Sequence, residues 1–233
     1  MVKPPAFNRN TGVRFPLLLP IKEKQRAKLV NFIGDVHAHF ASYKELISKL
    51  PDSIQLGDMG LGFDPRTDED FPDDPKHGFF RGNHDNPEVC RSMESYLGDY
   101  GFLHDEDIFF VSGAASVDRK WRTEGLNWWL DEELNHDQWE AVFELYGAMQ
   151  PPIVATHDCP FIVMDKICSG VFGSPQRSVT GMALDKMFDI HQPEMWVFAH
   201  HHRFKVWQQE KTLFVALGEL DVWDSDNRDR VRL

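Results

Sequence analysis

Short apolar runs recur along the chain, and most of them end at a glycine or run directly into a polar residue. Short apolar runs bounded by such turn residues are typical of buried strands. The strands expected on this basis are residues 29–33, 53–56, 78–81, 108–111, 153–156 and 196–199, followed by a closing hairpin of 204–209 and 212–217 around Glu210-Lys211.

Apolar residues at helical spacing separate these strands. A helix is expected from Ser42, because Ser42 and Glu45 form a capping box ahead of an apolar run that Pro51 ends. The other helices are expected over residues 87–96, from Asn135 or His136 onward, and over residues 180–191. Alternating strands and helices indicate an α/β fold with a buried sheet, and the late hairpin suggests a second, more antiparallel sheet. The expected fold is therefore α/β, a layered α/β sandwich of two mixed β-sheets flanked by helices.

One domain is expected to account for most of the chain. Its 233 residues, 42% of them hydrophobic, are enough to bury a sizeable core. We expect residues 29–233 to form this single domain and residues 1–28 to be a basic N-terminal arm, either part of the domain or flexible. The arm carries seven Lys and Arg against one acidic residue. It could touch a polyanion, although a solvated tail is the commoner role of such a segment.

Charge, hydropathy and cysteine content narrow the class of protein. The net charge of −12 makes a poor platform for long nucleic acids, which bind basic stripes. No apolar run approaches the roughly 20 residues of a membrane span, and the proline-interrupted N-terminus is not a signal peptide. The three cysteines lack CxxC spacing, which favours reduced, structural thiols. We therefore expect a soluble cytoplasmic protein, monomer or homodimer, with no membrane partner.

The segment 64–75 is strongly acidic. It holds six Asp and Glu residues among three prolines, a composition typical of a solvated loop. A lid or a third cation site is its functional alternative, and the sequence leaves this open.

Five of the expected strands lead into side chains that bind metal ions well. They are Asp35 with His37, Asp58, Asn83 with His84, His157, and His200 with His202. In α/β sheets the ligand sites lie beyond the carboxyl ends of strands, so these side chains are expected to converge on one rim. Oxygen and imidazole donors without thiolate suit Mn, Fe, Zn, Co or Ni. Two such ions can clamp a phosphoryl oxygen and supply a hydroxide at neutral pH.

The order and spacing of these motifs resemble a known family. Gly34-Asp35-Val36-His37, Gly57-Asp58, Gly82-Asn83-His84-Asp85, His157 and His200-His201-His202 together span residues 30–203. This set resembles the calcineurin-like metallophosphoesterase superfamily, and its motif sequences are most similar to those of the small bacterial or phage-type members. The resemblance implies a layered α/β sandwich that hydrolyses phosphate esters through a metal-bridging hydroxide, with two divalent metal ions, manganese foremost.

The resemblance also implies a role for each residue. Asp35, His37 and His202 would hold one metal ion. Asn83, His157 and His200 would hold the other, and Asp58 would bridge the two. His84 would be the general acid or an electrostatic clamp near the substrate, and Asp85 could orient it. His201 is expected to point away from the metals if the segment is extended.

The sequence departs from the protein-phosphatase branch of this family after Asp58. Leu61 and Gly62 stand where that branch carries a second Asp and a phosphate-binding Arg. Arg81, directly before Gly82, does match the motif of that branch. Substrate contacts therefore stay unassigned, with Arg81, Arg66 and His39 as weak candidates.

The sequence leaves three functions open. The Arg81 motif leans toward a phosphomonoesterase acting on phosphoproteins or broadly. The missing arginine favours a phosphodiesterase or nuclease, because a dianionic monoester gains more from an added cation than a diester does. A non-catalytic interaction scaffold on the same fold is the alternative from another class. The loop at Trp121-Arg122-Thr123-Glu124-Gly125 lies between two elements, where substrate specificity could be built.

Overall fold

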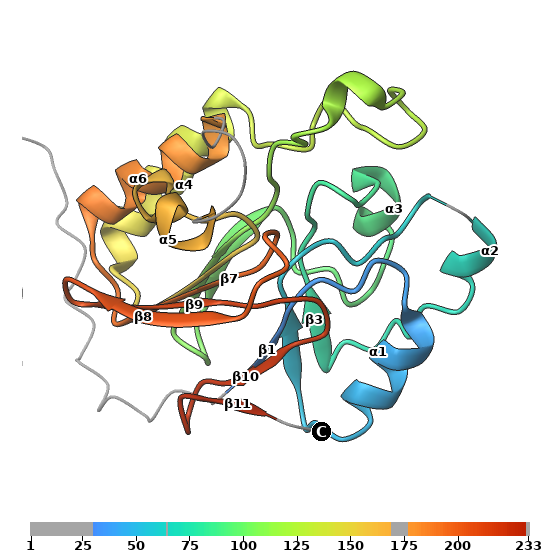
Figure 1. Cartoon of the computed structure of the whole chain (residues 1–233), viewed down its shortest axis with the longest axis horizontal. Coiled ribbons are helices and arrows are strands. Elements are labelled where there is room, and N and C mark those ends of the chain that lie inside the picture. Colours follow the sequence, from blue (N-terminus) through green and yellow to red (C-terminus); the bar gives the residue numbers. More distant parts are fainter. Residues whose placement is uncertain (1–29, 64, 169–176, 232–233) are drawn as a thin grey trace, which may run out of the picture.

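The computed structural model describes residues 30–63, 65–168 and 177–231 (Figure 1). The basic arm of residues 1–28 lies outside these ranges. The described chain forms two mixed sheets that face each other. The first sheet has the order β11 (Asp229–Val231), β10 (Val222–Asp224), β1 (Asn31–Ile33), β2 (Ser53–Gln55) and β3 (His77–Phe79). Strands β1, β2 and β3 are parallel, whereas β10 and β11 are antiparallel to their neighbours.

The second sheet is mainly parallel. Its order is β4 (Tyr100–Leu103), β5 (Ile108–Val111), β6 (Ile153–Thr156), β7 (Met195–Phe198), β9 (Thr212–Ala216) and β8 (Lys205–Gln209). Only the edge strands β4 and β8 are antiparallel to their neighbours. The predicted hairpin at Glu210-Lys211 is confirmed, but the expectation of a more antiparallel second sheet was wrong. The hairpin only adds an edge to a core of parallel strands.

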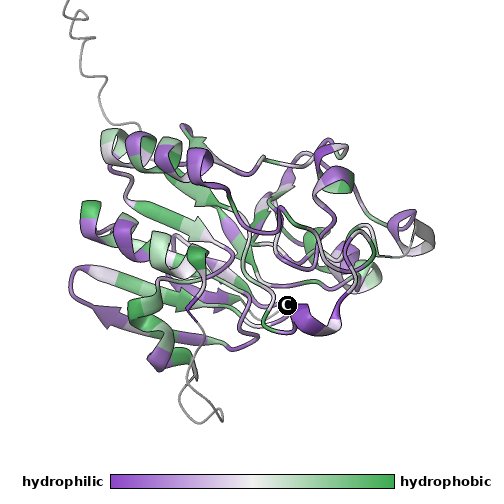
Figure 2. Ribbon diagram, turned by 90° about the horizontal axis from the view of Figure 1, so that it is seen from above, coloured by the Kyte–Doolittle hydropathy of each residue, from purple (hydrophilic) through white to green (hydrophobic). Residues whose placement is uncertain are grey.

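Helices cover the outer face of each sheet (Figure 2). On the second sheet lie α4 (His136–Met149), α5 (Met164–Cys168) and α6 (Val179–Ile190), with the 3-10 turn η2 (Phe161–Val163) before α5. On the first sheet lie α1 (Phe40–Ile47), α2 (Pro65–Asp68) and α3 (Pro87–Arg91). The 3-10 turn η1 (Arg119–Trp121) belongs to a segment that projects above both sheets. The layered α/β sandwich expected from the sequence is confirmed.

Alternating side chains along the strands build three hydrophobic layers. Phe109 faces the core between the second sheet and its helices, while the next residue, Phe110, faces the core between the two sheets. In the first sheet Phe32 joins the central core and Ile33 packs beneath α1 and α3. Successive strand residues point to opposite faces, so a run that is apolar at every position must be buried on both sides. The sandwich follows from this pattern.

Several element boundaries differ from the sequence predictions. Helix α1 begins at Phe40, and its N-cap is His39, which makes no capping hydrogen bond, so the capping box at Ser42 was wrong. The preceding residues His37 and Ala38 are left-handed, and the helix starts once the backbone leaves that region. The capping box at Asn135 is present at the start of α4. Strands β4, β10 and β11 were missed, and α2 lies within the acidic segment expected to be a loop.

Candidate metal centre

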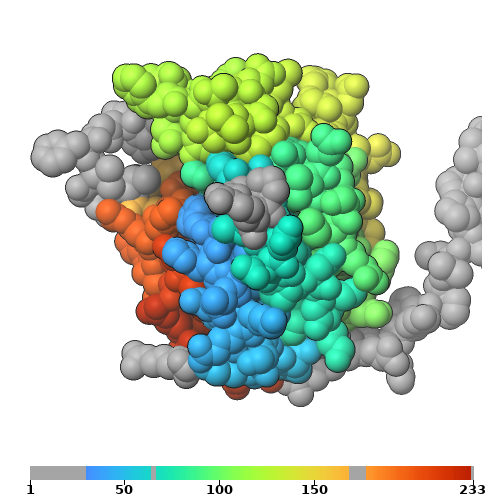
Figure 3. Space-filling model, turned by 90° about the vertical axis from the view of Figure 1, so that its right-hand side faces the viewer, coloured from blue at the N-terminus to red at the C-terminus, as the bar shows by residue number. Residues whose placement is uncertain are grey.

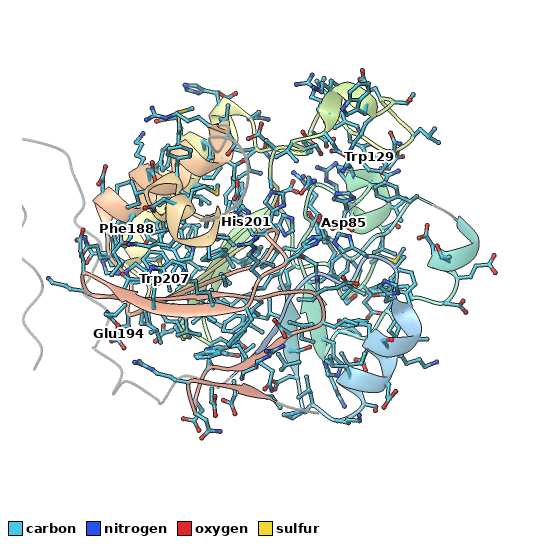
Figure 4. All side chains as sticks on the ribbon, in the orientation of Figure 1. Asp85, Trp129, Phe188, Glu194, His201 and Trp207 are labelled. Atoms are coloured by element: carbon cyan, nitrogen blue, oxygen red, sulfur yellow. The ribbon has the colours of Figure 1, made fainter. Side chains whose placement is uncertain are left out.

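The loops after five parallel strands meet at one rim of the sandwich. Strands β1, β2 and β3 of the first sheet and β6 and β7 of the second all end there. The structure brings together side chains from each of these loops: Asp35, His37, Asp58, Asn83, His84, His157, His200 and His202. In Figure 4 the labelled residues Asp85 and His201 lie near this rim, at the middle of the molecule. The convergence expected from the strand ends is therefore present.

Asp35, His37 and His202 form the first candidate metal-binding group. The two imidazole Nε2 atoms lie 3.0 Å apart, and His202 Nε2 lies 3.4 Å from Asp35 Oδ2. Asp35 is fully buried, whereas His37 is partly exposed and His202 is exposed. Two imidazole nitrogens and a carboxylate oxygen thus point at one small volume that is open to solvent on one side.

Asp58, His157 and His200 form the second group. His157 Nε2 lies 3.2 Å from Asp58 Oδ1 and 3.3 Å from the side-chain oxygen of Asn83. The other ring nitrogen, Nδ1, is 2.7 Å from the carbonyl oxygen of Leu56, an arrangement in which Nδ1–H donates. That hydrogen bond holds the proton on Nδ1, so a bound cation would take the lone pair of Nε2, as is usual for a metal-binding histidine.

Asp58 links the two groups. Its Oδ1 faces His157, and its Oδ2 lies 4.0 Å from His37 Nε2 in the first group. The backbone N–H of His200 in turn donates to Asp35 Oδ1 at 3.2 Å, which joins the groups a second time. One carboxylate therefore faces both candidate sites, the position that a bridging ligand needs.

Strained backbone accompanies this geometry. Four of the converging residues are left-handed: His37, Asp58, His200 and His202 have φ between 48° and 64°. Such conformations cost energy in non-glycine residues and cluster at functional sites. Gly82 permits the close approach between loops, since a Cβ there would collide with Asp58 Oδ1 and lie 2.5 Å from the Asp58 backbone nitrogen. Backbone strain and a close contact between loops thus accompany the inward orientation of these side chains.

The electrostatics of the groups are strongly perturbed. Burial raises the pKa of Asp35 to about 8, against the opposing charge of His157. For His157, burial works to lower the pKa, but the carboxylates of Asp58 and Asp35 outweigh it and raise the pKa to about 9. Burial lowers the pKa of His200 to about 3, so its ring is neutral and keeps a lone pair at ordinary pH. Carboxylates crowded this closely in a buried site favour a neighbouring cation, here the His157 imidazolium, whose place a bound metal ion would take.

The residues present fit divalent metal ions. Asp35 Oδ2 and Asp58 Oδ2 are buried and accept no hydrogen bond from the described residues. Buried carboxylate oxygens are almost always paired, so two such atoms beside converging imidazoles indicate a ligand site. The donor set of carboxylate, imidazole and amide oxygen contains no thiolate, a composition that suits manganese, iron, zinc, cobalt or nickel.

His84 lies beside both groups. Its backbone N–H donates to Asp58 Oδ1 at 2.7 Å, and its ring centre is 5.2 Å from that of His37. The Nε2 atom of His84 lies 2.7 Å from Nη2 of Arg122, which donates to it. Burial lowers the pKa of His84, and the charge of Arg122 lowers it further against the opposing effect of Asp58. The ring partner of His84 in the structure is therefore an arginine.

Asp85 has a different set of partners from the one expected. Its carboxylate accepts backbone hydrogen bonds from Gly60 and Gly82, both at 2.7 Å, and longer ones from Met59 and Leu61. These bonds tie the loop after β2 to the loop after β3. Asp85 thus holds the backbone that follows Asp58 and the backbone that precedes Asn83, and its described hydrogen bonds do not include the His84 ring.

A pocket of about 420 Å³ opens onto the second group and His84. Its walls include residues from the segment 115–118, together with Arg122, Arg177 and Ser178. The sequence favours the loop at Arg122 as a place for specificity, but it predicted no role for Arg122 or Asp118 themselves. No motif marks either residue, and the contact with His84 spans 38 positions along the chain.

The weak substrate candidates lie elsewhere or outside the described side chains. Arg81 is fully buried and donates to Asp99 and to the Glu132 carbonyl oxygen. His39 is exposed, lies 3.1 Å from Glu219 and lines a separate hollow. The Arg66 side chain falls outside the described part of the chain. The pocket walls therefore include neither Arg81 nor His39.

A third cluster lies behind the second group. His201 Nε2 is 3.1 Å from Asp158 Oδ1 and 3.5 Å from Cys159 Sγ, and these three residues form a further possible metal-binding group. The segment is not extended, since His200 and His202 are left-handed, and His201 lines the same pocket as its two neighbours. The Asp158 carboxylate already accepts hydrogen bonds from the Cys159 backbone and from Ser178. The polar groups of this third cluster are therefore well satisfied.

Comparisons with known proteins include distant matches among the solved structures. No family model and no curated protein matches the chain. Among the solved structures that match is a hypothetical protein from Thermus thermophilus, with 16% identity over 83% of this chain and 77% of that one, at a TM-score of 0.47. GAP50, the anchor in the inner membrane complex of Plasmodium, matches with 10% identity over 82% and 71%, at 0.45. The phosphopantetheinyl hydrolase PptH from Mycobacterium tuberculosis matches with 11% identity over 83% and 91%, at 0.44.

These likenesses carry no argument about activity at such identities and TM-scores. In the described residues no helix is both long and apolar enough to cross a membrane. What the chain does must therefore be argued from the two ligand groups and the pocket beside them.

Proposed function

We propose that this protein is a metal-dependent phosphoesterase. The observation that carries the proposal is the pair of ligand groups that share Asp58, each with a buried carboxylate oxygen that lacks a hydrogen bond from the described residues. Asp35, His37 and His202 would hold one divalent cation. Asn83, His157 and His200 would hold the other, with Asp58 between them. When bound, such cations activate water and neutralise charge on a phosphoryl group.

The remaining chemistry belongs to residues of the chain. His84 is the residue that we assign to the leaving oxygen, because it lines the pocket beside Asp58 and His37. It can transfer a proton there only from its protonated form, in which Nε2 no longer accepts from Arg122. Asp85 acts as a positioning residue, because its backbone hydrogen bonds hold the loops that carry Asp58 and Asn83. The Asn83 side-chain N–H donates to Ser116 at 3.2 Å, which turns the amide oxygen toward His157.

The test is hydrolysis by metal-stripped protein reloaded with manganese. Para-nitrophenyl phosphate and its bis-ester would be compared side by side, with bound metal measured in the same samples. Metal-dependent cleavage of either ester supports the proposal, and faster cleavage of the bis-ester would favour a phosphodiesterase or nuclease. Bound metal without cleavage of either ester would contradict the proposal and favour the scaffold alternative.

His84→Gln separates catalysis from metal binding. His84 contacts the ligand groups through its backbone N–H, which the substitution keeps, so the metal content is expected to stay at the wild-type level. Turnover is expected to fall by about 100- to 10,000-fold, the usual effect of losing a general acid. The measurement is kcat on the better ester together with metal analysis. Unchanged turnover would remove His84 from the mechanism.

A further inference from the structure

The segment between β5 and α4 forms a lobe, residues 113–134, that stands above the two sheets (Figures 1 and 3). It is fastened to the rim by buried polar contacts. Ser116 accepts from the Asn83 side chain, and its own hydroxyl donates to Glu132 Oε2 at 2.5 Å. Arg81, fully buried below, donates to the carbonyl oxygen of Glu132 at 2.9 Å. The lobe is therefore fixed in position relative to Asn83, a candidate metal ligand.

Arg122 reaches from this lobe into the pocket. Its side chain is 8% exposed, and the lobe itself holds it by a hydrogen bond from Nε to Asp118 Oδ1 at 2.6 Å and one from Nη1 to the Asn127 carbonyl oxygen at 3.2 Å. The third bond, from Nη2 to His84 Nε2 at 2.7 Å, ties the guanidinium to the rim. A guanidinium bound at three nitrogens is preorganised and loses little entropy on binding a ligand.

The guanidinium keeps donor capacity for a ligand. Each terminal nitrogen carries two N–H groups, and among the described residues each has only one acceptor. One N–H on Nη1 and one on Nη2 thus remain beside the pocket. One N–H from each terminal nitrogen of a guanidinium can bind two oxygens of a phosphoryl group, as in a bidentate arginine contact.

No other described residue supplies this group so close to His84. The loop after β2 contributes Leu61, which is fully buried, and Gly62 at the positions that could have carried a charged side chain. Arg177 also lines the pocket, but it is exposed and its guanidinium lies 5.0 Å from the ring centre of Phe161. Arg122, by contrast, is largely shielded from solvent and is bonded to His84 at the rim.

We propose that Arg122 binds the phosphoryl group and makes the site selective for phosphomonoesters. This inference rests on the proposed function. A monoester presents a dianion with three free oxygens, so two of them can take the N–H groups of Arg122 while another faces the ligand groups. A diester has a second substituent in place of one oxygen and carries one negative charge less, so it gains less from the same guanidinium.

The experiment compares Arg122→Gln with wild-type protein, both loaded with manganese. On para-nitrophenyl phosphate, kcat/KM is expected to fall by about 10- to 100-fold, the effect of losing a charge-assisted pair of hydrogen bonds. On the bis-ester the change is expected to stay within about 3-fold. Binding of inorganic phosphate, measured by calorimetry on the same samples, is expected to weaken by a similar factor to the monoester kcat/KM.

Two further variants separate binding from mere support of the lobe. Lys120→Gln makes the same change of charge on η1, away from the pocket walls, and is expected to leave both esters and phosphate binding at wild-type values. Arg122→Lys keeps the charge without the fork and is expected to recover only part of the monoester preference. A merely structural Arg122 would lower the cleavage of both esters equally.

The outcomes distinguish this inference from the proposed function. Wild-type protein that binds metal but cleaves neither ester overturns the proposed function, and phosphate calorimetry then still decides on Arg122. Cleavage by the wild type with an unchanged monoester-to-diester ratio in Arg122→Gln overturns the role of Arg122 alone. Unaltered phosphate binding in Arg122→Gln does the same.

Discussion

Two buried polar clusters lie next to each other at the rim, and they differ in how well they are satisfied. One is the set of candidate metal ligands around Asp58. The other is the network of Arg81, Asp99 and Glu132 beneath the lobe. In this network Arg81 donates to Asp99 at 2.7 Å, and Tyr96 donates to the same oxygen at 2.8 Å. Both clusters draw on the loop after β3, which carries Arg81 and Asn83 two residues apart.

The ligand cluster combines unsatisfied atoms with strain. Two of its carboxylate oxygens lack a hydrogen bond from described residues, and four of its residues are left-handed. Among the described residues, the network around Arg81 has neither feature: its charged atoms are paired and its backbone is ordinary. A buried polar cluster that is fully paired serves the fold, whereas one that leaves charges unpaired costs stability that only a ligand can restore.

The largest expected effect comes from removing the shared carboxylate charge. In Asp58→Asn the left-handed backbone is retained, because Asn tolerates that conformation. The amide cannot neutralise two cations, so bound metal is expected to be lost together with at least about 1,000-fold in turnover, or ~4 kcal/mol of transition-state stabilisation. Metal analysis and ester hydrolysis on the same preparation are the measurement. An Asp58→Asn variant with both metal and activity would refute the shared-ligand model.

The same cluster shows how far the sequence alone could go. Strand ends predicted the convergence of Asp35, Asp58 and His157, because parallel strands deliver their carboxyl ends to one edge whatever their exact bounds. Asp85 was expected to orient His84, yet its carboxylate holds backbone N–H groups. A local sequence motif predicts which loop carries a carboxylate. It does not predict which of several nearby N–H groups will donate to that carboxylate.

Arg122 illustrates what remained beyond reach. Its segment has no apolar periodicity, and the lobe owes its shape to specific contacts such as that of Arg122 with Asp118 and that of Ser116 with Glu132. Strands β4, β10 and β11 were missed for a related reason: they are short and only partly apolar, and pairing with a neighbour defines them. The core strands and the ligand loops were predictable because burial on both faces imposes a composition that the sequence displays.

Arg81→Met tests how much the fully paired network around Arg81 contributes to stability. The substitution leaves Asp99 without its buried partner, and the free energy of unfolding of metal-free protein is expected to fall by about 3 kcal/mol. Arg91 pairs with the same carboxylate from a half-exposed position, so Arg91→Gln is the control and is expected to cost less than about 1 kcal/mol. Urea unfolding followed by tryptophan fluorescence measures both. Equal losses in the two variants would mean that burial does not distinguish the pairs.

The smallest effect expected is a loss of stability at acidic pH that comes from Asp99 of the satisfied network. Burial works to raise the pKa of Asp99, but the charge and hydrogen bond of Arg81 outweigh it and hold the pKa below its ordinary value of 3.8. A carboxyl with a lowered folded-state pKa stabilises the protein above its unfolded-state pKa, and this stabilisation fades as the pH falls through the folded-state value. Asp99→Asn is therefore expected to lower the free energy of unfolding by about 2 kcal/mol at pH 7 and by progressively less below about pH 4.

The control for this pH dependence is Asp131→Asn. Asp131 is half-exposed, and Arg91 is its partner. Its loss is expected to cost less than about 0.5 kcal/mol, with urea unfolding measured from pH 7 down to the lowest pH at which the fold persists. If the cost of Asp99→Asn stayed constant over this range, its carboxylate would not be held ionised by Arg81. The contrast between the paired network and the unpaired ligand cluster would then rest on geometry alone.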